Sequence, residues 1–123
     1  MATAYTADYM TVNAGEVIVE GTIVLTGDYG GASTHGDTLD LSAVYYQGLA
    51  LPVSGLPIFY SIVEMPDSGT APTGYIFGYG IGTTLANGVL TVMASTTEYT
   101  EASAYSAGLL AAVIKARFVF KSL

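Results

Sequence analysis

The chain has 123 residues, of which 51% are hydrophobic and only 11% are charged, and its formal net charge is −7. This length suits one domain with one hydrophobic core, and so few charges favour burial of part of the surface against other subunits. The acidic balance opposes nucleic-acid binding, which needs clustered Lys and Arg. Because cysteine is absent, disulfides, thiolate metal sites and cysteine nucleophiles are excluded.

Two kinds of targeting segment are also disfavoured. The longest uncharged run, residues 41–63, is interrupted by Gly48, Pro52, Gly55 and Pro57, so it does not suit a membrane helix. The first ten residues lack the basic and apolar regions of a secretory signal. We therefore expect no membrane partner.

Residues 1–15 show no sustained hydrophobic period and contain two tyrosines, Tyr5 and Tyr9. Alone, such a segment buries too little apolar surface to become ordered. It is interpreted either as a frayed terminus or as an extended N-terminal arm whose tyrosines dock on a neighbouring molecule. The remainder, residues 16–123, is expected to form a single β domain.

The first strong element covers residues 16–26, where Val17, Val19, Ile23 and Leu25 share one face. This alternation predicts a half-buried strand, and Gly21 within it indicates a bulge or a close backbone approach. Residues 27–37 are rich in glycine, aspartate, serine and threonine, which predicts a loop.

Further strands are predicted over residues 39–47 and 58–64. The second of these runs, IFYSIVE, is almost continuously apolar, which is typical of a central strand or of one covered by another subunit. In residues 75–82 aromatic side chains alternate with glycines, so one face of that strand is nearly bare. Asn87-Gly88 predicts a hairpin that pairs residues 75–86 with 89–95 in antiparallel fashion.

A turn or short helix is expected within residues 96–108, and a strand closes the chain. In that strand Ile114, Ala116, Phe118 and Phe120 share one parity, while Lys115, Arg117 and Lys121 lie on the other. Short strands separated by turn signals predict an all-β fold, an antiparallel sandwich or barrel of about seven strands.

No recognisable catalytic or cofactor motif accompanies these elements. The only histidine, His35, lies in the glycine-rich loop without a nucleophile elbow, so a solvent-facing or interface role is favoured over catalysis. Asp28, Asp37 and Asp40 form the best oxygen-ligand cluster for Ca²⁺, but the EF-hand pattern is absent. We therefore expect no cofactor, and a bound calcium ion remains an open alternative.

The ten tyrosines suit subunit interfaces and also carbohydrate-stacking surfaces, and the low charge favours interfaces. The basic residues of the last strand have two interpretations as well: they balance carboxylates on adjacent strands, or they form a cationic stripe that contacts an acidic partner. The candidate contact residues are Tyr5, Tyr9, His35, Lys115, Arg117 and Lys121.

Several segments together resemble small virion proteins of tailed bacteriophages, namely β-rich head decoration (cement) or related structural proteins. The resemblance covers much of residues 16–123 and lies in EGTIVLTG, GDTLDLSAV, TGYIFGYG, LANGVLTVMAS and the closing IKARFVF. It implies a non-enzymatic subunit located in the virion capsid. Its partner would be the major capsid protein, and it would form a symmetric homo-oligomer with a trimer favoured. The alternatives are a carbohydrate- or surface-binding β-sandwich module and, as a remainder, a hydrolase.

Overall fold

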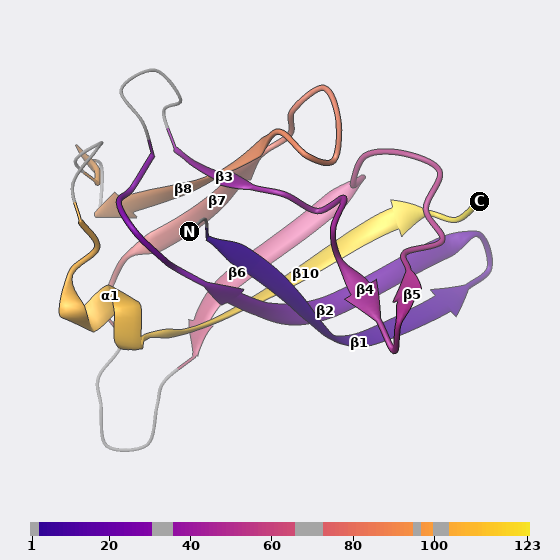
Figure 1. Ribbon diagram of the computed structural model, residues 1–123, viewed down its shortest axis with the longest axis horizontal. Coiled ribbons are helices and arrows are strands. Elements are labelled where there is room, and N and C mark those ends of the chain that lie inside the picture. Colours follow the sequence, from indigo (N-terminus) through magenta and orange to yellow (C-terminus); the bar gives the residue numbers. More distant parts are fainter. Residues whose placement is uncertain (1–2, 31–35, 66–72, 95–96, 100–103) are drawn as a thin grey trace.

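A computed structural model describes residues 3–30, 36–65, 73–94, 97–99 and 104–123. Within these ranges the chain is mainly β-structure with one short helix (Figure 1). The elements are β1 (Ala4–Asn13), β2 (Glu16–Val24), β3 (Asp37–Leu39), β4 (Tyr45–Tyr46), β5 (Leu49–Ala50), β6 (Phe59–Met65), β7 (Ile76–Gly80), β8 (Gly88–Ala94), β9 (Thr97–Glu98), α1 (Ala107–Ala111) and β10 (Val113–Lys121). The predicted all-β fold is confirmed.

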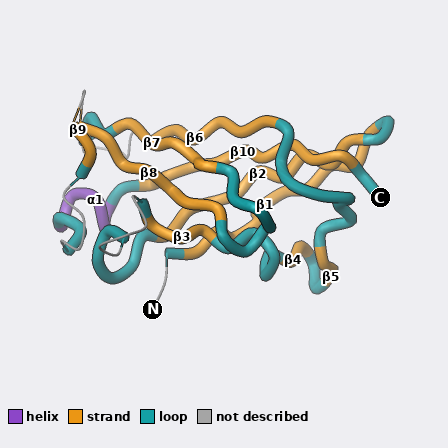
Figure 2. Tube along the Cα trace, turned by 90° about the horizontal axis from the view of Figure 1, so that it is seen from above, coloured by secondary structure: helices purple, strands orange, loops and turns teal. Residues whose placement is uncertain are grey.

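The larger sheet has four antiparallel strands in the order β1-β2-β10-β6. The smaller sheet has the order β3-β8-β7, with β9 paired to β8, and β4 and β5 form a separate hairpin. The two sheets lie in layers with the core between them (Figure 2), and the described strands do not close into a barrel. The sandwich alternative therefore describes the architecture.

The core is built from the inward faces of both sheets. β2 contributes Val17, Val19 and Ile23, as its alternation predicts, and each of these side chains is fully or almost fully buried. In β10 the predicted apolar parity is also the buried one. Phe118 lies at the centre, with its ring centroid 5.1 Å from that of Tyr5 and 5.2 Å from that of Tyr79 in the opposite sheet.

The N-terminal segment is not the separate arm expected from its composition. Residues 4–13 form β1, which pairs with β2 along its whole length, and the Tyr5 side chain is only 7% exposed. Gly21 makes this possible, because a Cβ there would lie 2.9 Å from the Tyr5 ring. The close approach predicted at Gly21 is thus an aromatic ring lying across a glycine, and it ties the segment to the domain.

A β-bulge at Asp8 changes which side of β1 faces the core. Ala7 lies opposite Gly21 and Tyr9 lies opposite Glu20, so Asp8 is the extra residue. Tyr5 and Tyr9 are four apart and would share a face in a regular strand. The bulge instead turns Tyr5 into the core and leaves Tyr9 60% exposed.

Three other predictions need correction. The strand predicted over residues 39–47 is only β3 and β4 with turns between them. Of the two alternatives for the apolar strand β6, the central strand is wrong because β6 lies at a sheet edge, and cover by another subunit stays a prediction. Asn87-Gly88 ends a longer loop that begins after Gly80, because the Asn87 Oδ1 atom accepts from the Thr84 amide at 2.9 Å and holds that loop together. The antiparallel pairing of β7 with β8 is nevertheless confirmed.

The predicted turn or short helix in residues 96–108 is partly matched by α1, which starts after the cap residue Ser106. The Ser106 hydroxyl accepts a hydrogen bond from the Leu109 amide, a normal N-cap contact. No helix within the described ranges is long and apolar enough to cross a membrane.

Candidate interaction face

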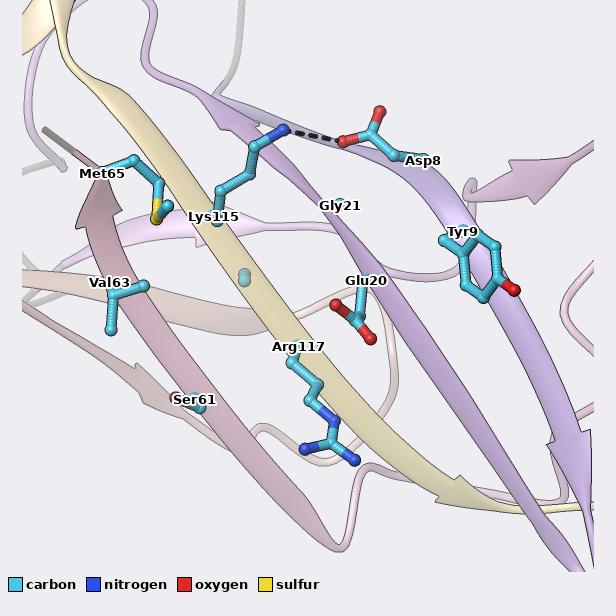
Figure 3. A pocket seen from close by; sticks show the side chains of 10 residues that line it. Asp8, Tyr9, Glu20, Gly21, Ser61, Val63, Met65, Lys115 and Arg117 are labelled. Carbon is cyan, nitrogen blue, oxygen red and sulfur yellow. Dashed lines mark hydrogen bonds and ion pairs between the residues drawn. The ribbon is translucent and has the colours of Figure 1, made fainter. Parts of the chain in front are cut away.

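The solvent-facing side of the larger sheet carries most of the predicted contact residues. We call it the outer sheet face and define it by the outward side chains Asp8, Tyr9, Glu16, Glu20, Thr22, Phe59, Ser61, Val63, Met65, Lys115, Arg117 and Lys121. Its centre is an open groove of about 430 Å³ between β1 and β6 (Figure 3).

One end of the groove is organised by the bulge residue Asp8. The Lys115 Nζ atom lies 3.1 Å from the Asp8 carboxylate and 2.8 Å from the Thr22 hydroxyl, which itself donates to Asp8 at 2.7 Å. The Thr22 hydroxyl, followed by the Lys115 ammonium, lowers the pKa of Asp8 in spite of partial desolvation. Lys115 therefore balances a carboxylate, as one of the two sequence interpretations predicts, but this carboxylate lies two strands away and not on an adjacent strand.

The next row of the face holds two opposite charges that do not form an ion pair with each other. Arg117 lies directly opposite Glu20 in the register of β10 and β2. Both side chains project from the same face in Figure 3, yet no ion pair links them within the described chain. The guanidinium and the carboxylate therefore both stay available to an outside molecule.

The β6 side of the face is apolar. Phe59 is 55% exposed and Val63 50% exposed, and Met65 also lies on the surface. Ser61 lies between Phe59 and Val63 on this side of β6 and is paired with Arg117. It is smaller than the other side chains of its row, Tyr9, Glu20 and Arg117. An exposed apolar strand beside a row of opposite charges suits contact with a protein surface better than it suits solvent.

The predicted contact residues separate into three groups. Tyr9, Lys115 and Arg117 meet at the groove, and Lys121 lies at the end of the same face opposite Glu16. Tyr5 is buried, so its prediction as a contact residue is wrong, because its ring covers Gly21 instead. His35 lies outside the described residues.

The three aspartates proposed as calcium ligands do not form a cluster. Asp37 is buried and accepts hydrogen bonds from the Thr3 hydroxyl and, at 2.6 Å, from the Tyr105 hydroxyl. Asp40 accepts from the amide and hydroxyl of Ser42. Within the described ranges no group of three or more His, Asp or Glu side chains could hold a metal ion.

Asp37 instead supports the fold at the point where β1 and β3 begin. Burial, and then the hydrogen bond to Asp37, raise the pKa of Tyr105 above its ordinary value. The carboxylate thus fixes Thr3 and Tyr105, which are far apart in the chain, in one polar contact inside the core.

The β4–β5 hairpin is a surface feature that the sequence did not indicate. Its turn residues Gln47 and Gly48 both have positive φ, at 52° and 80°, which is the geometry of a tight two-residue hairpin. Tyr45 is 59% and Leu49 68% exposed. The hairpin contacts β1 and stands at the margin of the molecule in Figure 2. The dipeptide Gln-Gly is a weaker signal than Asn-Gly, so this turn was missed.

Comparisons of the chain with protein-family models, with curated proteins and with solved structures found no match.

Proposed function

We propose that this protein is a non-enzymatic virion structural protein that binds the surface of a phage capsid and stabilises it as a decoration subunit. The observation that supports assembly is the large amount of exposed apolar surface in a chain with only 11% charged residues. The capsid as the partner follows from the sequence resemblance described above.

Two groups of exposed apolar side chains differ in character. On the outer sheet face they lie beside charges of both signs, whereas on the β4–β5 hairpin they stand on a protruding turn. A short, rigid hairpin with an aromatic and a leucine side chain can insert into a cleft between capsid subunits at little entropic cost. We assign capsid contact to Tyr45 and Leu49 for this reason.

Stabilisation of the shell would follow from mass action. A subunit that binds the closed capsid, and loses its site when the capsomers separate, lowers the free energy of the closed state. The contact area then determines how strongly the shell resists opening.

Co-sedimentation with assembled capsids that lack the protein tests this function. Wild-type protein should pellet with capsids, and Leu49→Asp should remain in the supernatant because a carboxylate would enter an apolar contact. Thr38→Asp, an exposed change on β3, is the matched control and should pellet like the wild type. Wild-type protein that stays in the supernatant at every concentration contradicts the proposal.

A second candidate function has one observation in its favour. Tyr9 stands exposed beside a groove lined by Asp8, Glu20, Lys115 and Arg117, a combination of aromatic and polar groups that also suits a sugar ring. On this alternative the protein is a carbohydrate- or surface-binding module. A glycan array tests it, and a hit that Tyr9→Ala abolishes would favour it over the capsid proposal.

A further inference from the structure

We propose that the outer sheet face is a self-association surface, on which a second copy of this chain packs about a two-fold axis that runs along the strands between β2 and β10. This proposal goes beyond capsid binding and concerns the protein alone in solution. It rests on the charge balance of the face, on the strand order and on the side chains that the strand order places opposite one another.

The first argument is electrostatic. Three of the ten carboxylates lie on this face, namely Asp8, Glu16 and Glu20, together with all three basic residues of the chain. The charges described on this face therefore balance, and four further carboxylates that the structure describes lie off it, namely Asp28, Asp37, Asp40 and Glu64. Because its charges balance, this face can meet the same face of a second copy without an excess of like charges.

The second argument is the order of the strands. A two-fold axis parallel to the strands places β2 of one copy over β10 of the other, and β1 of one copy over β6 of the other. Each row of side chains then faces the same row of the second copy. The Arg117 side chain then faces the second copy's glutamate of the same row, and Glu20 faces its arginine. The row of Glu16 and Lys121 is matched in the same way.

The third argument is steric and apolar. Tyr9, Glu20, Arg117 and Ser61 form one row across the four strands. The same axis places the exposed Tyr9 ring of each copy above Ser61 of the other. Since Ser61 is small and its neighbours two residues away are Phe59 and Val63, the ring enters an apolar notch. The exposed side of β6 is thereby covered.

The size of the face sets the expected affinity. Four strands about 4.8 Å apart, over roughly seven residues of about 3.4 Å each, give a face of roughly 19 by 24 Å. Standard interfaces bury about 800 Å² of accessible surface on each partner. The outer sheet face falls at or below that size, so we expect a dimer in the micromolar range and not a permanent one. An interface with two-fold symmetry is complete when two copies have met, so no third copy can add to it. The proposed dimer therefore differs from the trimer that the resemblance favours.

Sedimentation velocity over a range of protein concentrations tests the proposal, with charge reversals as the decisive variants. Glu20→Arg and Arg117→Glu should each weaken dimerisation about tenfold or more, because each homodimer then contains two contacts between like charges. An equimolar mixture of the two variants should dimerise again, since every contact across the axis in the mixed pair joins opposite charges. A contact within one subunit cannot be rescued by mixing.

Control variants separate association from folding. Thr38→Arg and Thr38→Glu introduce the same charged side chains on the exposed side of β3 and should dimerise like the wild type. Ser61→Arg fills the notch for Tyr9 and should give a monomer with an unchanged circular dichroism spectrum. A wild-type protein that stays monomeric into the millimolar range, a trimer insensitive to these changes, or a mixture that is not rescued overturns the proposal.

Discussion

The Tyr5 hydroxyl donates a hydrogen bond to the main-chain carbonyl oxygen of Ala116 at 2.9 Å, although a whole strand separates the two residues. The Tyr5 side chain starts on β1, crosses β2 above Gly21 and ends on β10. A single side chain therefore links three strands of the larger sheet, and it couples an N-terminal segment of weak apolar character to the centre of the core.

Replacing Tyr5 by Phe tests the hydrogen bond by itself. The ring still covers Gly21, but the Ala116 carbonyl loses a buried donor, so we expect a loss of about 1 kcal/mol in the free energy of unfolding. Urea denaturation measures it. Tyr9→Phe, which changes an exposed ring on the same strand, should leave the midpoint unaltered. Equal effects for the two changes would mean that the hydroxyl of Tyr5 contributes nothing.

Gly21→Ala tests the close approach. A Cβ at this position would clash with the Thr6 carbonyl oxygen and lie 2.9 Å from the Tyr5 ring, and the main chain cannot move aside easily. We expect destabilisation of about 1–3 kcal/mol, the usual result of overpacking. Gly55→Ala is the matched control, because nothing lies within 4 Å of its Cβ and its φ is not positive. Its thermal midpoint should stay level or rise slightly.

Deletion of residues 1–13 tests whether the segment belongs to the domain. The deletion removes β1 and Tyr5, and truncation of a buried aromatic ring alone costs about 3–5 kcal/mol. We expect the shortened chain to lose its near-ultraviolet circular dichroism signal and its cooperative melting transition. A shortened chain that melts at the wild-type temperature would restore the interpretation as a free arm.

Phe118→Ala tests the assignment of the two faces of β10. Phe118 is fully buried and contacts the rings of Tyr5 and Tyr79, so its truncation should cost about 3–5 kcal/mol in chemical denaturation. Phe59→Ala on the neighbouring strand is the control, because that ring is 55% exposed and loses far less burial. If the larger effect came from Phe59, the core would lie on the opposite side of the sheet.

Alkaline pH should unfold the protein through its buried tyrosines. Burial, followed by the carboxylates Asp8 and Glu20, raises the pKa of Tyr5, and burial followed by the Asp37 hydrogen bond raises the pKa of Tyr105. Because the folded-state pKa values exceed the ordinary 10.0, the neutral rings stabilise the fold fully below about pH 10. That stability is lost as the pH rises further, since only the unfolded chain ionises.

The measurement is the free energy of unfolding as a function of pH. We expect it to fall above about pH 10, and Tyr105→Phe should make the fall less steep because one raised pKa is removed. Tyr45→Phe, which alters an exposed ring, should leave the slope as it is. A slope that does not change with Tyr105→Phe would show that another group controls alkaline unfolding.

Strands with strict alternation could be predicted from the residues alone. In β2 the burial of each side chain repeats every two residues, as the sequence does, so the local pattern is sufficient. In β10 the alternation holds as far as Phe118, and Val119 on the other parity is buried as well. The continuous apolar run of β6 indicated a strand but not its place, because an edge strand that is exposed and a central strand that is covered have the same composition.

The candidate interaction face was only partly predictable. Lys115 and Arg117 could be placed on one side of a strand by their spacing, but nothing in the sequence shows that Asp8 forms a bulge. That bulge moves Tyr9 to the opposite side from Tyr5 and so sets it in the same row as Arg117. The short turns at Ala14-Gly15 and Gln47-Gly48 could not be predicted either. Each places a non-glycine residue at positive φ, which its residue type does not indicate.

The all-β class, the core faces of β2 and β10, and the shortage of charge that favours assembly could all be derived from the order of the residues. These properties depend on composition and on neighbours two residues apart. Three other properties became visible only in the folded chain: the N-terminal segment is a strand, β6 is an edge strand, and opposite charges share one face. Each of these depends on register between strands distant in the chain, and register is fixed by packing, such as the Tyr5 ring on Gly21, that no local pattern records.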